Sequence, residues 1–176
     1  MRVFVTGATG FIGTAVVQEL IHAGHQVLGL SRSDAGAKSL IDAGAKVHRG
    51  DLEDLESLRI GASMSEGVIH CAFIHDFSVY AASVETDRRA VEAIAGALEG
   101  SGKPLVIASG TLMVAHARPG TEQDVPASVD VPRAASEATG DCGVRPRRAR
   151  QRPAAAANST WRRRPWLRTD ADRHRA

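Results

Sequence analysis

The stretch TGATGFIG, residues 6–13, decides the fold of this chain, because it joins a strand-like segment to a helix-like one through three glycines. Before it, RVFVT (2–6) is a short apolar run rich in β-branched side chains, which is typical of a strand inside a parallel sheet. After it, residues 11–24 fit a helix that ends at Gly24. The apolar positions predict a buried helix face made of Ile12, Val16, Leu20 and Ala23.

The three glycines have the spacing and the context of a phosphate-binding turn. Gly7 permits a tight turn, Gly10 lets backbone N–H groups approach a pyrophosphate, and Gly13 lets the helix pack closely on the strand. A glycine trio alone is a weak signal, but a strand before it and a helix after it are the context that the motif requires. The alternative is a glycine-rich turn that binds no ligand.

Strand-like and helix-like segments alternate through the first two thirds of the chain. Further strands are predicted at 25–31, 45–50, 66–73 and 103–110. Further helices are predicted at 34–45, 51–62 and 83–102. On the last of these we expect Asp87, Arg88 and Arg89 to lie on the solvated face, and a substrate or cofactor contact is the alternative. With right-handed crossovers, this βαβαβαβαβ order predicts the α/β fold class, with a Rossmann-like doubly wound parallel sheet and helices on both faces.

Composition changes sharply after Pro132. Residues 1–132 carry 10 Lys and Arg against 16 Asp and Glu, a net charge of −6, whereas residues 133–176 carry 12 Arg against 4 Asp and Glu, a net charge of +8. Residues 145–176 contain no Val, Ile, Phe or Met, so we expect this segment to be disordered. We therefore divide the chain into an incomplete, truncated nucleotide-binding domain at 1–140 and an Arg/Ala/Pro-rich tail at 141–176.

The tail has three interpretations. Its 11 arginines can neutralise phosphates, so one interpretation is a basic, disordered arm that contacts nucleic acid. A second is a segment that binds an anionic surface or a protein partner. Arginine without lysine, among runs of Ala and Pro, is also what GC-rich codons give when they are translated without selection for a fold. Shifted by one base, codons for PWLRTDADRHR (165–175) can spell HGFVPTLIGI, so a frameshift is the interpretation that we prefer.

The glycine motif resembles that of the short-chain dehydrogenase/reductase superfamily, in its extended or atypical branch of NAD(P)-dependent epimerases, dehydratases and related reductases. The resemblance covers residues 1–140 and includes GDLEDLESL (50–58) and VIHCAF (68–73). GFVPTLIGI, in the shifted frame, resembles the stretch where extended members enter the substrate domain. The resemblance implies hydride transfer between a nicotinamide cofactor and a small carbonyl or alcohol substrate.

The resemblance also implies a set of residues that bind a nicotinamide dinucleotide. The pyrophosphate would contact the glycine turn and the first helical turn, at Gly7, Thr9, Gly10, Phe11, Ile12 and Gly13. The acidic residue after the third strand would touch the adenine, which points to Asp51 and Leu52. At the end of the fourth strand, His70, Cys71 and Ala72 would line the path of the ribose.

The end of the second strand bears on the choice between NAD and NADP. Family members that prefer NAD place a carboxylate there to hold the ribose hydroxyls, and this sequence has Ser31 and Arg32 instead. An arginine matches a 2′-phosphate through charge-assisted, bidentate hydrogen bonds, so NADP is the preferred cofactor and NAD the alternative. A solvated loop arginine without a ligand is the competing interpretation.

The catalytic pattern of the family is incomplete. Members pair a Ser or Thr after the fifth strand with Tyr-x-x-x-Lys on the next helix, and Ser109 or Thr111 would supply the hydroxyl beside the nicotinamide. The only tyrosine, Tyr80, has no lysine four residues on, and the expected place holds Arg133 and Glu137 at that spacing. Weak activity or none is therefore expected, and a non-enzymatic NADP-binding sensor with a basic tail is the alternative.

Other features exclude several classes of protein. The start lacks a signal peptide and no apolar run reaches the ~20 residues that cross a bilayer, so we expect a cytoplasmic protein without a membrane partner. Aromatic residues make up only 4% of the chain, too few for extensive stacking on nucleic acid. Cys71 and Cys142 form no CxxC pattern, so no disulfide is predicted. His70 and His75 are five residues apart, and strand residues at that spacing point to opposite faces, so no metal site is predicted.

The resemblance also implies a sixth strand and a substrate domain after residue 140, which this sequence lacks. Loss of the sixth strand would leave the fifth as an open edge of the sheet. We therefore expect a chain that is partly unfolded, forms a homodimer through that edge, or aggregates.

Overall fold

The computed structural model describes residues 1–109. Residues 110–176, which include the tail at 141–176, lie outside the described residues. In chain order the elements are β1 (Arg2–Thr6), α1 (Phe11–His22), β2 (Gln26–Ser31), α2 (Asp34–Asp42), β3 (Lys46–Arg49), α3 (Leu55–Ser63), β4 (Gly67–His70), the 3₁₀ turn η1 (Phe77–Val79), α4 (Tyr80–Leu98) and β5 (Leu105–Ile107).

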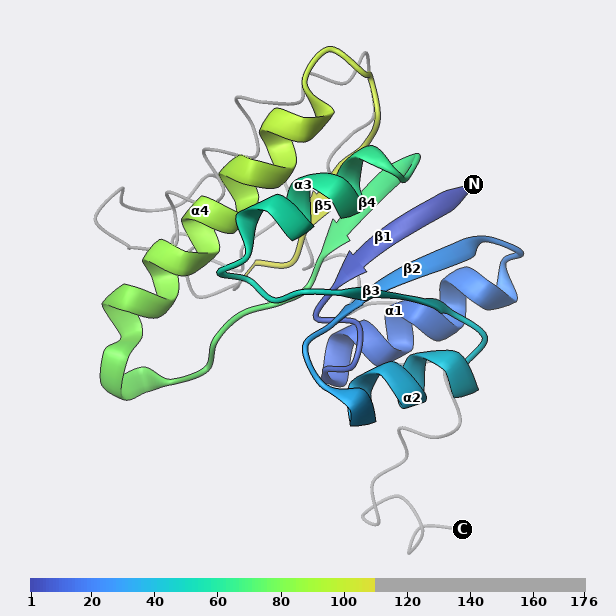
Figure 1. Cartoon of the computed structure of the whole chain (residues 1–176), viewed down its shortest axis with the longest axis horizontal. Coiled ribbons are helices and arrows are strands. Elements are labelled where there is room, and N and C mark those ends of the chain that lie inside the picture. Colours follow the sequence, from blue (N-terminus) through green and yellow to red (C-terminus); the bar gives the residue numbers. More distant parts are fainter. Residues whose placement is uncertain (110–176) are drawn as a thin grey trace, which may run out of the picture. The chain divides into compact units, whose positions relative to one another are not determined.

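The five described strands form one parallel sheet in the order β3-β2-β1-β4-β5 (Figure 1). The chain runs outward from β1 to β3 and then crosses back to β4 on the other side of β1. That reversal separates the carboxyl ends of β1 and β4 and creates the crevice in which doubly wound sheets bind ligands. The predicted Rossmann-like α/β fold is confirmed.

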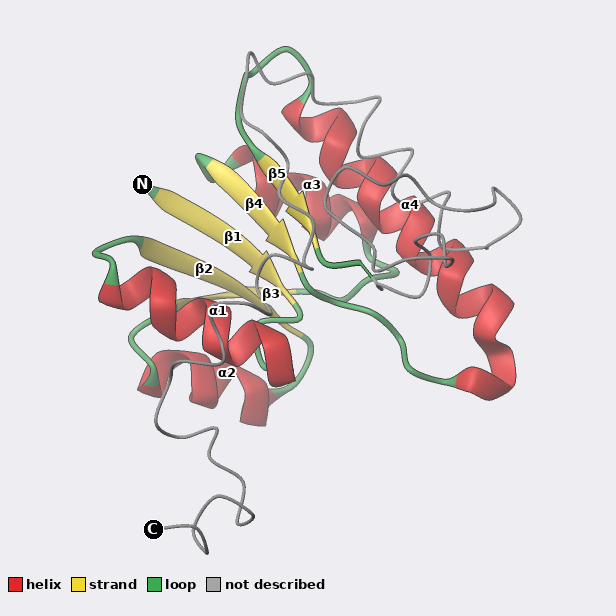
Figure 2. Cartoon of the chain, turned by 180° about the vertical axis from the view of Figure 1, so that it is seen from behind, coloured by secondary structure: helices red, strands yellow, loops and turns green. Residues whose placement is uncertain are grey.

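Helices cover both faces of the sheet, α1 and α2 on one and α3 and α4 on the other (Figures 1 and 2). Side chains of β1 contribute to the hydrophobic cores on both faces of the sheet, because successive side chains of a strand point to opposite faces. Val3 and Val5 pack in the cluster that contains Val17 and Leu40, whereas Phe4 packs in the cluster that contains Leu58. The strand at the centre of the sheet is therefore apolar on both faces, as its sequence predicts.

Helix α1 is rotated relative to the predicted face. Val17 is 2% exposed and Gly13 is buried, whereas Ile12 is 54% exposed. Val16 and Leu20 still pack against the core, so the prediction is wrong at its first and last positions, because Ala23 is also exposed. The reason is that Gly13 lacks a side chain, so the helix approaches the sheet along the line of Gly13 and Val17 and Ile12 turns outward.

Helix α3 begins four residues later than predicted. Asp54 is its N-cap, and the Asp54 side chain accepts a hydrogen bond from the Ser57 N–H. The preceding Asp51 accepts hydrogen bonds from the N–H groups of Glu53 and Asp54, at 2.8 and 3.0 Å. Residues 51–54 therefore form a turn instead of a first helical turn, since a short carboxylate competes well for local N–H groups.

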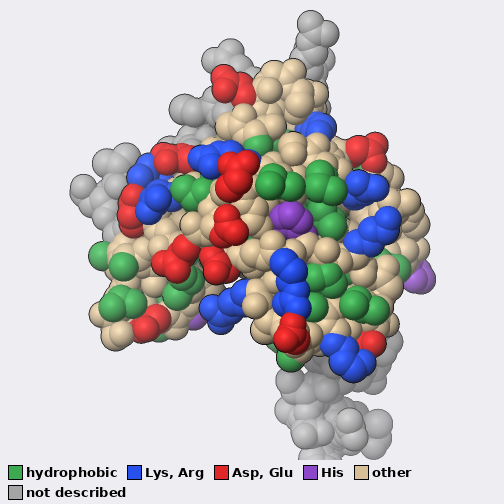
Figure 3. Space-filling view, viewed as in Figure 1, with side chains coloured by type: hydrophobic (Ala, Val, Ile, Leu, Met, Phe, Trp, Pro, Cys, Tyr) green, Lys and Arg blue, Asp and Glu red, His purple; other side chains and the backbone are tan. Residues whose placement is uncertain are grey.

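Helix α4 corrects the prediction for Asp87, which is fully buried instead of solvated. Asp87 shares a helix face with the buried Val84, Val91 and Ile94, so the 3.6-residue period turns it inward. Arg88 lies on the other face, where it pairs with Glu85 and Glu92. Figure 3 shows acidic and basic side chains interspersed over this part of the surface.

No described helix is long and apolar enough to cross a membrane.

Candidate functional site

A hollow of about 900 Å³ lies where the carboxyl ends of β1, β2, β3 and β4 meet the loops that follow them. The structure brings to it twelve of the thirteen residues that the sequence predicted for a dinucleotide, all except His70. They are Gly7, Thr9, Gly10, Phe11, Ile12, Gly13, Ser31, Arg32, Asp51, Leu52, Cys71 and Ala72. Segments separated by more than 60 residues in sequence therefore form a single concave surface.

The glycine turn is packed too tightly for side chains. Gly7 has φ +63°, a left-handed conformation, and a Cβ placed on it would lie 2.7 Å from the backbone nitrogen of Ala72. A Cβ on Gly13 would lie 1.9 Å from the carbonyl oxygen of Gly7. The backbone of the turn is thus in direct contact with both α1 and the segment after β4, and Gly7, Thr9 and Gly10 of the turn line the hollow.

The N-terminus of α1 differs from those of the next two helices. Its N-cap is Gly10, which has no side chain to accept hydrogen bonds, whereas Ser33 caps α2 and Asp54 caps α3 through their side chains. The first N–H groups of any α-helix have no partner within the helix. At α1 these donors belong to residues that line the hollow, and the helix dipole adds partial positive charge.

Ser31 and Arg32 occupy one end of the hollow. The Ser31 side chain is buried and its hydroxyl donates to the Ser33 carbonyl at 3.0 Å. Arg32 is exposed and has no ion-pair partner within residues 1–109, whereas the nearby Arg49 pairs with Asp34. The guanidinium of Arg32 is therefore available to an anionic group that enters this end.

Asp51 and Leu52 form another part of the wall. The Asp51 carboxylate is held by the N–H groups of the turn that precedes α3. Leu52 is 9% exposed and packs in the core beneath the turn. This arrangement fixes the backbone of both residues while one face of the turn stays open to the hollow.

The segment after β4 contributes Cys71 and Ala72 but not His70. Burial raises the pKa of the Cys71 thiol to about 11, so the thiol is protonated near neutral pH and is a poor nucleophile. The prediction that His70 lines the ribose path is wrong, because His70 is 1% exposed and absent from the lining. Its ring lies inside the protein between Thr6 and Asp87.

Sequence reasoning missed part of the lining. The additional residues are Leu30, Ser33, Gly50, Glu53, Phe73, Ile74, His75 and Asp76. Half of them belong to the segment between β4 and α4, where the rings of Phe73 and His75 are in edge contact at 5.2 Å. Their position directly after a predicted parallel strand is the signal that identifies them, because ligands bind at those strand ends.

The remaining predicted residues lie at or beyond the end of the described part. Ser109 is its last residue, two positions after β5, and Thr111 lies outside the described residues, as do Arg133 and Glu137. Within residues 1–109, no group of three His, Cys, Asp or Glu side chains is placed to hold a metal ion.

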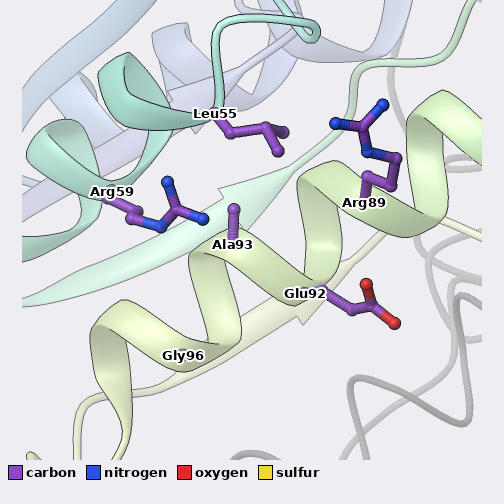
Figure 4. Close-up of a pocket in the computed structure, with 6 residues that line it drawn as sticks. All are labelled: Leu55, Arg59, Arg89, Glu92, Ala93 and Gly96. Atoms are coloured by element: carbon purple, nitrogen blue, oxygen red, sulfur yellow. The ribbon is translucent and has the colours of Figure 1, made fainter.

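A smaller pocket of about 240 Å³ lies between α3 and α4, and it shares no lining residue with the hollow (Figure 4). Leu55, Arg59, Arg89, Glu92, Ala93 and Gly96 line it. Arg59 is paired with Glu56 at 3.4 Å on the same helix. This pocket contains none of the residues predicted for the dinucleotide, but it contains Arg89, for which a substrate or cofactor contact is the alternative.

Comparison with known proteins places the chain among relatives of similar sequence. An uncharacterized protein of Saccharomyces cerevisiae is 50% identical over 126 residues, which are 70% of this chain and 42% of the yeast protein. An uncharacterized protein of Schizosaccharomyces pombe is 44% identical over 140 residues, which are 79% of this chain and 48% of that protein. The chain thus spans about half the length of the curated relatives that it matches.

The UDP-glucose 4-epimerase of Thermus thermophilus, solved as a complex with NAD, has a similar structure. Its TM-score is 0.61 at 27% identity, and the match covers 81% of this chain and 49% of the epimerase chain. The model of the NAD-dependent epimerase/dehydratase family matches residues 3–137. This match confirms the resemblance to the extended branch of the short-chain dehydrogenase/reductase superfamily, and the chain belongs to the NAD-dependent epimerase/dehydratase family.

Proposed function

We propose that residues 1–140 are the dinucleotide-binding part of an NADP-dependent oxidoreductase or epimerase-like protein. The observation that carries the proposal is the hollow, in which the glycine turn, the N-terminus of α1, Arg32 and Asp51 face one space. A dinucleotide needs donors for its pyrophosphate, a partner for its adenosine ribose and a contact for its adenine, and these groups supply them in that spatial order. The NAD in the Thermus thermophilus epimerase complex supports this cofactor class.

The preference for NADP rests on Arg32 and Ser31. In place of a carboxylate that would hold two ribose hydroxyls, this site has a guanidinium without an ion-pair partner among the described residues. Charge-assisted hydrogen bonds to a phosphate are about twice as strong as neutral ones. A 2′-phosphate would therefore bind more favourably here than a free 2′-hydroxyl.

The part of the hollow next to β4 bears on the proposed substrate and reaction. With the adenosine half at β2 and β3, the nicotinamide half would be held by the residues that follow β4, Cys71, Ala72 and Phe73. When bound, the nicotinamide supplies hydride transfer with a carbonyl or alcohol carbon of a small substrate. The chain's own residues there orient the cofactor, and because the sequence lacks Tyr-x-x-x-Lys we expect little turnover.

We further propose that the tail at 141–176 takes no part in cofactor binding. The family match ends at residue 137, close to the change to an arginine-rich composition after Pro132. Sequencing the coding DNA from Pro132 onward in all three frames tests the frameshift interpretation. If no neighbouring frame encodes strand-like Val and Ile runs, the tail is genuine, and the alternative function of an NADP-binding sensor gains support.

Titration calorimetry of the full chain with NADPH and with NADH tests the proposed function. Heparin is included in every titration to saturate the arginine tail, since a basic segment binds any polyanion. We expect NADPH to bind at least about tenfold more tightly than NADH, the factor that corresponds to about 1.4 kcal/mol. Binding of neither dinucleotide, or equal binding of NADPH and inorganic pyrophosphate, would refute the proposal.

A further inference from the structure

Three polar side chains deep in the protein link β1, β4 and α4. Thr6, His70 and Asp87, which we name the buried triad, are 0%, 1% and 0% exposed. The Thr6 hydroxyl lies 2.8 Å from His70 Nδ1, and His70 Nε2 lies 3.2 Å from Asp87 Oδ1. None of the three side chains lines the hollow, so none of them contacts a ligand there.

The hydrogen bonds of the buried triad run in one direction. A carboxylate only accepts, so His70 donates from Nε2 to Asp87. In the neutral ring Nδ1 is then an acceptor, and the Thr6 hydroxyl donates to it. Both contacts are satisfied by the tautomer that carries its proton on Nε2.

The other end of the buried triad reaches the wall of the hollow. The Ala72 N–H donates to the Thr6 hydroxyl oxygen at 3.4 Å, and the Cys71 N–H donates to the Thr6 carbonyl at 3.2 Å. The backbone of Ala72 in turn lies directly against Gly7, where a Cβ would be only 2.7 Å from its nitrogen. The distance between the glycine turn and the segment after β4 is thus set by a side chain whose orientation His70 and Asp87 fix.

Apolar packing alone would not fix the relative position of β1, β4 and α4 in the same way. Polar groups cost free energy when they are buried, and apolar side chains of similar volume would fill the same space. Hydrogen bonds differ from apolar contacts in their dependence on distance and angle, and bonds in series strengthen one another. The buried triad therefore holds one relative position of β1, β4 and α4 where an apolar core would tolerate several.

We propose that the buried triad is a positioning device for the dinucleotide site. Through Thr6, it holds the backbone of Cys71 and Ala72 against the glycine turn. Through Asp87, it links α4 to this part of the wall of the hollow. The part of this inference that concerns cofactor affinity rests on the proposed function, whereas the part that concerns the Cys71–Ala72 segment does not. The two parts are measured separately.

The test compares Thr6→Val with Thr6→Ser in the full chain. Valine keeps the shape of threonine and removes the hydroxyl, whereas serine keeps the hydroxyl. Val91→Ala is the matched control, because Val91 is 0% exposed on α4, one turn from Asp87, and outside the buried triad. For each protein we would measure the unfolding midpoint, the hydrogen exchange of the Ala72 amide, and the Kd for NADPH.

We expect Thr6→Val to speed exchange of the Ala72 amide and to weaken NADPH about tenfold, with Thr6→Ser close to the wild type. Val91→Ala should lower the unfolding midpoint and leave both site measurements unchanged. Unchanged Ala72 exchange in Thr6→Val would overturn the inference, as would equal losses of affinity in Thr6→Val and Val91→Ala. If the wild type binds no dinucleotide, the proposed function fails and Ala72 exchange alone decides the inference.

A second measurement needs no variant. Nitrogen-15 NMR of the wild type distinguishes a protonated from an unprotonated ring nitrogen, and it remains decisive if Thr6→Val does not fold. We expect His70 to be protonated at Nε2 and unprotonated at Nδ1. A proton on Nδ1 would reverse the bond to Thr6 and overturn the direction that the inference requires.

Discussion

Replacing Gly13 by alanine tests whether the close contact between α1 and the glycine turn is real. A Cβ on Gly13 would lie 1.9 Å from the Gly7 carbonyl oxygen and 2.7 Å from the Gly7 carbonyl carbon. Both atoms belong to the backbone, so no side-chain rotation relieves the clash. The Gly7 oxygen also accepts the Gly10 N–H at 2.9 Å, so moving it weakens the turn itself.

The expected loss of stability combines two destabilising terms and one stabilising term. Overpacking of this kind costs about 1–3 kcal/mol, and the strained hydrogen bond adds about 1 kcal/mol. Alanine is better than glycine in a helix by about 1 kcal/mol, which offsets part of the loss. We expect Gly13→Ala to lower the free energy of unfolding by about 1–3 kcal/mol, which corresponds to a fall in Tm of about 4–24 °C for a domain of this size.

The matched control is the same substitution in α4. A Cβ on Gly96 would meet nothing within 4 Å, and Gly96 lies on the exposed face at the edge of the small pocket (Figure 4). Gly96→Ala should therefore raise stability by about 0.5–1 kcal/mol through helix propensity alone. Urea unfolding of both variants, followed by circular dichroism, measures the two effects. Destabilisation of less than about 0.5 kcal/mol in Gly13→Ala, or the same sign in both variants, would refute the reasoning.

Arg32→Ala should lower the affinity for NADPH about ten- to a hundredfold, because one charge-assisted phosphate contact is lost, and should change the affinity for NADH by no more than about twofold. Calorimetry that gives equal losses of affinity for the two dinucleotides would contradict the assignment. In a Cys142→Ser background, alkylation of Cys71 should be slow at about pH 8 and still accelerate above about pH 9.5, because burial raises its pKa to about 11; a rate that levels off near pH 9 would show an ordinary thiol. A chain that ends at residue 140 should bind NADPH within a factor of about two of the full chain and unfold at the same midpoint, since the tail has little to bury. A large loss of affinity in that chain would assign the tail a part in binding.

The glycine turn could be predicted because its signal is local. Its glycines, the strand before it and the helix after it lie within 25 residues, and each has a distinct pattern. Arg32, Asp51 and Cys71 could be proposed for the same site because parallel strands end at one edge of a sheet, so residues that follow them converge. Their conformations could not be predicted in this way, and Asp51, for example, proved to hold a turn instead of beginning a helix.

By itself, the sequence determined the alternation of strands and helices, the parallel sheet and the group of residues that meets at its carboxyl edge. These follow from periods of 2 and 3.6 residues and from glycine chemistry, which act over a few neighbouring residues. Only the tertiary structure decided that Asp87 turns inward, that His70 points away from the hollow and that Ile12 faces solvent. Those outcomes depend on helix rotation and on contacts such as the one between Thr6 and His70, which are 64 residues apart and meet only when β1 pairs with β4.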